Sequence, residues 1–195
     1  LFVLPLSPFA PAVAIHPNDA AKSALAGTLD AELEQIAALA SHPRVRAIGE
    51  TGLDYFRTGE EGREGQHASF RAHLAIAAQH GLAVQIHDRD AHEDVIRVLR
   101  EERFDGPVVF HCFSGDTSMA RIAREEGWYL SFGGTATFKN SDELRAALAL
   151  TPADRLLVET DAPFLTAAPY RGRPNAPYLI PLAVRAVADH RGDDL

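Results

Sequence analysis

Short apolar runs, each followed by an acidic residue or a histidine, constrain the fold of this chain more than any other feature. These residues are Glu50 after VRAIG, His87 after LAVQI, His111 after PVVF and Asp161 after LLVET. Such runs, alternating with helical periodicity, are typical of buried parallel strands. Because the carboxyl ends of parallel strands meet at one rim of a barrel, the four side chains are predicted to gather there and share a metal ion.

Six segments are expected to be strands, and helices lie between them. The expected strands cover roughly 12–15, 45–49, 82–86, 107–110, 128–132 and 155–159, and the expected helices lie within 28–41, 66–81, 90–103, 116–127 and 140–152. This alternation predicts an α/β fold, a TIM (β/α)8-type barrel. A closed barrel needs eight strands, so the barrel is expected to be incomplete, with about six βα units present and the first strands missing. An open doubly wound sheet is the alternative, although its ligands would concentrate at one switch point.

The length and composition indicate one soluble domain over residues 1–195, with an irregular start at 1–11. One cysteine, Cys112, excludes an intrachain disulfide, and nine histidines suit a reducing compartment, so the cytoplasm is the expected location. The apolar opening contains three prolines and no basic residue before Lys22, so it resembles neither a transmembrane helix nor a signal peptide. We therefore expect no membrane association, and nothing indicates an obligate protein partner.

The formal net charge of -8 argues against tight, salt-sensitive binding to long nucleic acid, which needs many basic contacts to phosphate. A phosphate substrate in a pocket remains possible, because bound cations present positive charge even on an acidic protein. Charge alone therefore leaves the substrate open.

Each candidate ligand also has a purely structural interpretation. Glu50 could cap a helix or form a buried ion pair, and a single buried histidine such as His87 or His111 is usually a core residue that bonds to the backbone. Asp161 precedes Ala162 and Pro163, a sequence typical of a turn. Their occurrence together favours ligation, and a donor set of imidazoles and carboxylates without thiolates suits zinc, manganese or magnesium.

A divalent ion in such a site would favour hydrolysis. It lowers the pKa of bound water towards ~7 and polarises a phosphoryl oxygen, and a pair of ions can stabilise both the attacking and the leaving oxygen. Asp161, at a strand end beside cations, would stay ionised and could accept the proton of the attacking water. Four weaker candidates for substrate contacts or for orienting the ligands are His16, Asp54, Arg89 and Lys139.

Several motifs in order along the chain resemble the TatD family of metal-dependent deoxyribonucleases, which are amidohydrolase-like TIM barrels. They are AIHP at 14–17, AIGETGLDYFR at 47–57, VQIHDRDA at 84–91, VFHCFSG at 109–115, YLSFGGTATFKN at 129–140 and LLVETDAPFLT at 156–166. The resemblance covers most of residues 12–180. It implies that Glu50 bridges two divalent ions, that His87 and His111 bind metal, and that Asp161 is a ligand that also handles the proton of the water.

The chain departs from the family pattern at two places. The family carries an HxH motif on its first strand, and no HxH occurs in this sequence. Asn18 stands where many relatives carry a second histidine after His16 and Pro17. The resemblance therefore implies a domain that is truncated, or has its start replaced, at the amino end.

The sequence thus predicts a metal-dependent hydrolase acting on DNA or nucleotide phosphodiesters, as a TatD-type exodeoxyribonuclease with two divalent ions (Mg, Zn or Mn). One alternative is hydrolysis of a carbonyl substrate, such as an amide, a lactone or an aminoacyl ester, because fold and metal do not decide between carbon and phosphorus. The other is a catalytically impaired remnant that lacks the HxH ligands.

Overall fold

The computed structural model describes residues 10–194 as an α/β protein whose strands and helices alternate. The strands are β1 (Ala12–Val13), β2 (Ala47–Asp54), β3 (Ala83–Arg89), β4 (Val108–Phe110), β5 (Tyr129–Phe132) and β6 (Leu156–Val158). The α-helices are α1 (Pro17–Ala26), α2 (Leu29–Ala40), α3 (Glu60–His80), α4 (His92–Glu101), α5 (Thr117–Glu126), α6 (Asp142–Leu150) and α7 (Ile180–Arg191). Short 3-10 turns lie at η1 (Gly134–Thr137), η2 (Ala153–Arg155) and η3 (Pro177–Leu179). Of the expected irregular start at 1–11, residues 1–9 lie outside the described residues, and residues 10 and 11 precede β1.

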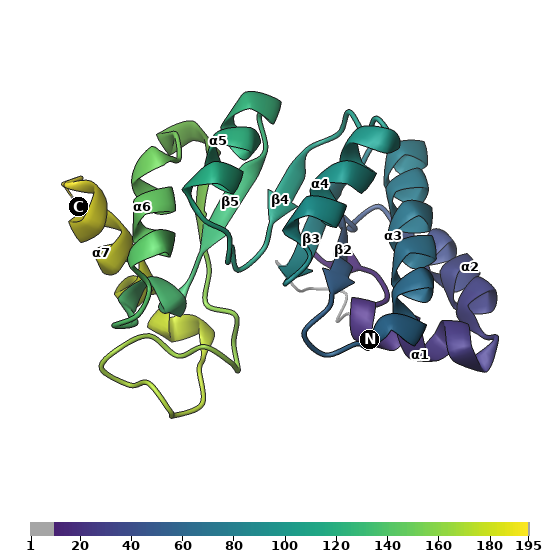
Figure 1. The fold of residues 1–195 in the computed structure, drawn as a ribbon, viewed down its shortest axis with the longest axis horizontal. Coiled ribbons are helices and arrows are strands. Elements are labelled where there is room, and N and C mark those ends of the chain that lie inside the picture. Colours follow the sequence, from purple (N-terminus) through teal and green to yellow (C-terminus); the bar gives the residue numbers. More distant parts are fainter. Residues whose placement is uncertain (1–9, 195) are drawn as a thin grey trace.

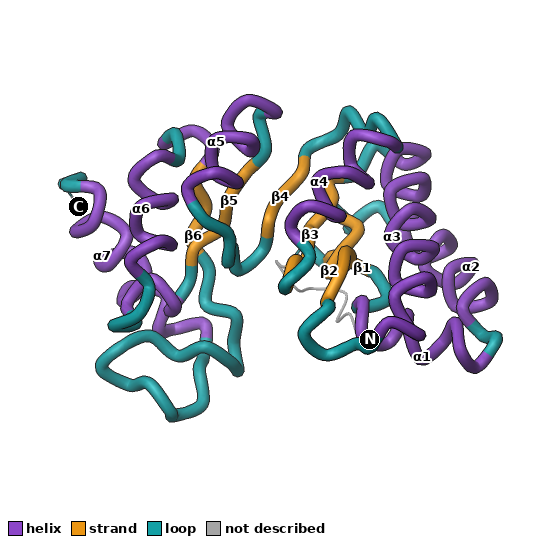
Figure 2. Tube along the Cα trace, in the orientation of Figure 1, coloured by secondary structure: helices purple, strands orange, loops and turns teal. Residues whose placement is uncertain are grey.

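The six strands form one parallel sheet in the order β1-β2-β3-β4-β5-β6, so every strand pairs with its neighbours in sequence. The helices flank this sheet, and the long loop after β6 hangs from its carboxyl end (Figures 1 and 2). The predicted α/β class and the six units of a TIM-type barrel are confirmed. The doubly wound alternative is wrong, because the strand order never reverses.

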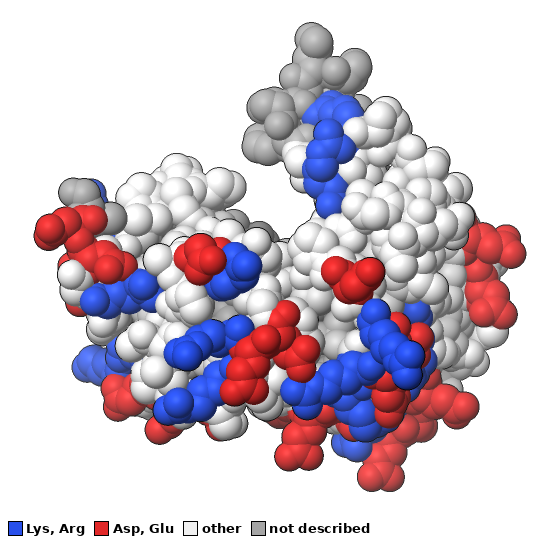
Figure 3. All heavy atoms as spheres, turned by 90° about the horizontal axis from the view of Figure 1, so that it is seen from above, with Lys and Arg blue, Asp and Glu red and all other residues white. Residues whose placement is uncertain are grey.

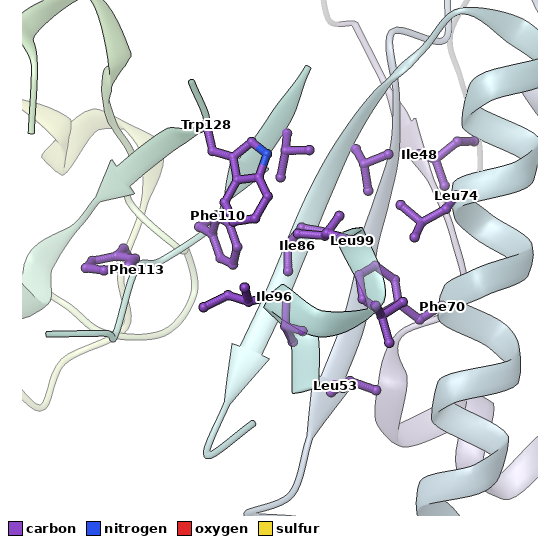
Figure 4. Close-up of a cluster of buried hydrophobic side chains, with 14 of the residues drawn as sticks. Ile48, Leu53, Phe70, Leu74, Ile86, Ile96, Leu99, Phe110, Phe113 and Trp128 are labelled. Carbon is purple, nitrogen blue, oxygen red and sulfur yellow. The ribbon is translucent and has the colours of Figure 1, made fainter. Parts of the chain in front are cut away.

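The hydrophobic core lies between the sheet and the helices that cover it. In register across three strands, Ile86, Phe110 and Leu130 lie side by side and are almost completely buried. Trp128 packs on Phe110, with ring centroids 5.4 Å apart, and the cluster extends to Phe70 of α3 (Figure 4). Alternate strand residues point to the opposite face. This alternation explains why the residue after each buried apolar one, such as His87 after Ile86, is turned away from the helices.

Two helices were not among the expected elements, although both carry ordinary start and stop signals. Helix α1 begins with Pro17, and its preceding residue His16 accepts a hydrogen bond from the Asn18 backbone N–H at 3.2 Å. Helix α7 has proline in its first turn, and Gly27 and Gly192 end the two helices at positive φ of 73° and 72°.

Strands β2 and β3 approach closely at Gly52. Its φ is 129°, and a Cβ built there would lie 2.1 Å from the carbonyl oxygen of His87. Only glycine fits this position, because any side chain would meet the neighbouring backbone. The register of β2 on β3 shifts between Ile48 and Thr51, which brings Glu50 beside His87.

Helix α3 carries two buried polar side chains that bond to the backbone near the carboxyl ends of the strands. Gln66 accepts from the Asp54 N–H at 2.9 Å and donates to the Asp54 carbonyl at 3.1 Å. His73 accepts from the Ile15 N–H at 3.1 Å and donates through Nδ1 to the Ser69 carbonyl at 2.7 Å. The longest helix therefore fixes both the end of β2 and the turn after β1.

Basic and acidic side chains are interspersed on the face of the molecule that is seen from above in Figure 3. Ion pairs form between helices, such as Arg100 of α4 with Glu126 of α5 at 2.7 Å, and within a helix, such as Arg97 with Asp94 of α4 at 2.7 Å. In the described residues, no helix is both long and apolar enough to cross a membrane.

We predict that Leu74→Ala lowers the free energy of unfolding by about 2 to 5 kcal/mol, because it leaves a cavity in the core. Leu74 is 2% exposed on α3, whereas Leu25 is 67% exposed on α1. Leu25→Ala is the matched control and should change stability by less than about 0.5 kcal/mol. Urea unfolding followed by circular dichroism measures both, and equal effects would contradict the assigned core.

We predict that the contribution of His73 to the free energy of unfolding is lost in acid. Burial lowers the pKa of His73 to about 4 from its ordinary value of 6.5. The unfolded chain therefore binds the proton first, so the stabilisation is complete above pH 6.5 and is lost as the pH falls towards 4, by about 3 kcal/mol in total. Unfolding free energies measured at several pH values should fall less steeply for His73→Gln than for the unchanged chain, and parallel curves would contradict this.

Candidate metal centre

A cavity of about 1460 Å³ lies at the carboxyl ends of the strands. Glu50, His87, His111 and Asp161 all line it, and so do three of the weaker candidates, His16, Asp54 and Arg89. Lys139, the fourth, is not part of this lining. The sequence expectation that polar residues from separate strand ends meet at one rim agrees with this geometry.

One carboxylate oxygen of Glu50 lies among three imidazoles. Glu50 Oε1 is 2.6 Å from His87 Nδ1, 3.7 Å from His16 Nε2 and 3.7 Å from His111 Nε2. The rings of His16 and His87 also contact each other edge to face, with centroids 4.6 Å apart. Glu50 therefore joins residues from the β1–α1 turn, β3 and the end of β4.

A second group surrounds His111. Its Nε2 is 3.3 Å from Asp161 Oδ1, and its Nδ1 is 2.9 Å from Glu159 Oε1. Glu159 directly follows β6, and the sequence analysis treated it only as the last residue of a strand. Its spacing from Asp161 was the signal that could have identified it, because residues two apart in an extended segment face the same side.

Left-handed backbone conformations flank this second group. Cys112, which follows His111, has φ 45°, and Asp161 has φ 55°. Aspartate tolerates this region better than most residues, and here its carbonyl accepts a hydrogen bond from the Phe164 N–H at 2.8 Å, forming a turn. The turn interpretation of Asp161 and its place in the cavity are thus compatible. The local strain, of order 1 to 3 kcal/mol per residue, is typical of functional sites.

The carboxylates of Glu50 and of the neighbouring Asp54 are stabilised in their ionised form. Burial alone would raise the pKa of Glu50, but the hydrogen bond from His87 and the charges of the surrounding imidazoles lower it below the usual range. Burial likewise opposes the ionisation of Asp54, and hydrogen bonds from the Arg57 N–H and the Asn18 side chain outweigh it, so this pKa is also lowered. Both groups are therefore anionic at neutral pH.

The pKa values of His16 and His111 are shifted in opposite directions. Burial alone would lower the pKa of His111, but its hydrogen bonds with Asp161 and Glu159 raise it to about 10. Burial and the neighbouring His87 lower the pKa of His16. The thiol of Cys112 has a raised pKa, first through burial and then through the surrounding carboxylates, which keeps it protonated. A thiolate ligand is therefore disfavoured.

The donor atoms fit a divalent cation. His16, Glu50 and His87 each offer one atom within 4.8 Å of the others, and so do His111, Glu159 and Asp161. Donor atoms around one ion bound at about 2.1 Å lie roughly 3 to 3.5 Å apart, close to several separations here. An ion bound in either group would replace the hydrogen bonds between imidazoles and carboxylates with ligand-to-metal contacts.

Asp54 contacts the first group of donor residues through His87. Its Oδ2 lies 3.1 Å from His87 Nε2 and accepts from the Asn18 Nδ2 at 3.1 Å. Asn18 was noted in the sequence only as a departure from the family pattern, and its amide here contacts the carboxylate that orients His87. Such contacts fix the tautomer and direction of a ligating imidazole.

Comparisons with known proteins place this chain in a family. The family model described as TatD related DNase matches residues 6–195. The "Uncharacterized metal-dependent hydrolase TatD" of Mycobacterium tuberculosis is 46% identical over 182 residues, which cover 91% of this chain and 67% of that protein. The "Uncharacterized metal-dependent hydrolase YcfH" of Escherichia coli K12 is 42% identical over 160 residues, which cover 82% of this chain and 58% of that protein. The chain thus spans about three fifths to two thirds of the length of these relatives.

Solved structures show the same fold. The crystal structure of YJJV, a TatD homolog from Escherichia coli K12, superimposes with a TM-score of 0.84 at 28% identity, over 94% of this chain and 69% of that one. A TatD family hydrolase from Entamoeba histolytica, at 24% identity, matches in fold with a TM-score of 0.80 over 97% of this chain and 71% of that one. From its sequence relatives and its architecture together, the chain belongs to the TatD family of metal-dependent hydrolases.

Proposed function

We propose that this chain is the metal-binding part of a phosphodiesterase that hydrolyses DNA. The observation that carries the proposal is the position of Glu50 Oε1 among three imidazoles, beside a second group of imidazole and carboxylates at His111. Two adjoining donor groups suit a pair of divalent ions, Mg, Zn or Mn, with Glu50 between them. When bound, such ions lower the pKa of water and polarise a phosphoryl oxygen.

Side chains of this chain would divide the work. His16, Glu50 and His87 would hold one ion, and His111, Glu159 and Asp161 the other. Asp161 would accept the proton of the water that attacks phosphorus, because its Oδ1 lies at the edge of the site beside His111. The bond from phosphorus to the 3′ or 5′ oxygen breaks, and an alcohol and a phosphate monoester leave.

Three features favour a phosphodiester over a carbonyl substrate. The matching family model is described as a DNase, and the cavity of about 1460 Å³ exceeds the 300 to 1,000 Å³ typical of small-molecule pockets. Arg89 lines the cavity and is suited to a phosphate contact. Hydrolysis of an amide, a lactone or an aminoacyl ester on the same centre is the competing proposal.

We predict that Glu50→Gln weakens Mn²⁺ binding by at least about 100-fold, because the charge shared by three imidazoles is lost. Isothermal calorimetry on the unchanged chain should give two ions per chain. Glu34→Gln, on the exposed side of α2, is the matched control and should bind as the unchanged chain does. At most one weakly held ion without hydrolysis would instead support the catalytically impaired remnant.

We predict that Asp161→Asn lowers kcat for phosphodiester hydrolysis by about 10² to 10⁴, because the amide cannot accept the proton. Cleavage of a labelled oligonucleotide measures the loss, and Asp30→Asn, exposed on α2, is the control. A panel of amides, lactones and aminoacyl esters is assayed in parallel. Release of carboxylic acids, with the oligonucleotide left intact, would replace the phosphodiesterase proposal by the carbonyl one.

A further inference from the structure

Two arginines at the cavity have no carboxylate partner. Arg57 and Arg89 both line it, and within residues 10–194 neither guanidinium forms a hydrogen bond or an ion pair. Six other arginines of the described residues do form ion pairs with carboxylates, for example Arg100 with Glu126 and Arg191 with Asp193. Arginines without a carboxylate partner beside a cavity are suited to an anionic ligand, above all a phosphate.

Both arginines are tied to the candidate metal centre through Asp54. The Asp54 Oδ1 accepts the backbone N–H of Arg57 at 2.8 Å, and its Oδ2 lies 3.1 Å from His87 Nε2. Arg89 stands two residues beyond His87 on β3 and pairs in register with Asp54 of β2. The two arginines therefore come from neighbouring strand ends, immediately beyond the residues that would hold the first ion.

An exposed aromatic ring accompanies them. Phe56, next to Arg57, is 62% exposed, and the guanidinium carbon of Arg89 lies 3.9 Å from the centroid of its ring. Stacking engages the face of the guanidinium and leaves its N–H edge free for a phosphate. Aromatic rings for bases, together with basic groups for the backbone, are the combination by which proteins bind single-stranded nucleic acid.

We propose that Phe56, Arg57 and Arg89 form a subsite for the nucleotide next to the one that is hydrolysed. The two guanidinium groups bind its phosphate, and its unpaired base stacks on the layer formed by Phe56 and Arg89. The proposal rests on the proposed function for the identity of the substrate. It uses other residues than the metal centre, so binding can test it separately from hydrolysis.

The phosphate part is tested with a fluorescent tetrathymidylate that carries slowly hydrolysed phosphorothioate linkages. Its Kd on the metal-loaded chain is measured by anisotropy at several NaCl concentrations. Arg57→Gln and Arg89→Gln should each weaken binding and reduce the slope of log K against log salt by about 0.7, the value for one phosphate contact on a single strand. Arg124→Gln, exposed on α5, should change neither quantity.

The stacking part is tested with a probe that lacks the bases. Phe56→Ala should weaken binding of tetrathymidylate about tenfold and leave binding of the abasic probe unchanged, because only the stacked base is lost. Phe56→Tyr should bind as the unchanged chain does, since the ring is kept. Tyr178→Ala, which removes a 79% exposed ring outside the cavity, is the control.

The outcomes separate this subsite from the proposed reaction. If the oligonucleotide is bound and the arginine variants change the salt slope, the subsite stands even where no phosphodiester is cleaved. If the chain cleaves DNA but both arginine variants keep the original Kd and salt slope, the subsite is wrong and the reaction stands. If Phe56→Ala weakens the binding of both probes equally, stacking is contradicted. If the unchanged chain binds neither probe, the subsite is overturned.

Discussion

The site depends on the sharing of one carboxylate oxygen, Glu50 Oε1, by imidazoles from three separate segments of the chain. None of these groups would be stable at this depth alone, because burial disfavours their charged forms. Their mutual attraction compensates, and it keeps Glu50 ionised while His111 holds a proton between two carboxylates. A divalent cation would replace that proton with a stronger charge, so ion binding and proton release are coupled in this arrangement.

The fold supports that arrangement from one side, mainly through helix α3. Gln66 bonds both backbone groups of Asp54, whose carboxylate contacts His87, and His73 bonds the backbone immediately before His16. Both side chains are completely buried, so their positions are set by the packing of α3 on the sheet. The hydrophobic core thus orients the polar groups at the rim but is not itself part of the site. Barrel folds generally separate the packed core from the functional residues in this way.

The predicted sheet is confirmed, and Glu50, His87, His111 and Asp161 line one cavity, as expected from the apolar run before each of them, which is typical of a buried strand. The sequence signal for His16, which lies 3.7 Å from Glu50, was weaker, because β1 spans only Ala12–Val13 and is too short a pattern to identify a strand end. Glu159 lies at the end of a predicted strand, where its N–H continues the pairing with β5 by donating to the Phe132 carbonyl at 3.0 Å, and its side chain contacts His111. A contact between residues so far apart in the sequence depends on tertiary structure that no local pattern encodes.

The donor residues and the residues suited to contact a substrate lie at different levels of this rim. Two of the donor groups, Glu50 and His87, stand within β2 and β3, and the others follow a strand by one to three residues. Phe56, Arg57 and Phe164 lie in the loops beyond. We propose that the strand residues supply the hydrolytic chemistry that the family shares, and that the loops beyond them select the substrate. In a chain with a net charge of -8, two arginines without carboxylate partners, Arg89 at the end of β3 and Arg57 in the loop after β2, are more informative about the substrate than the donor set, because no acidic group in the described residues explains their charge.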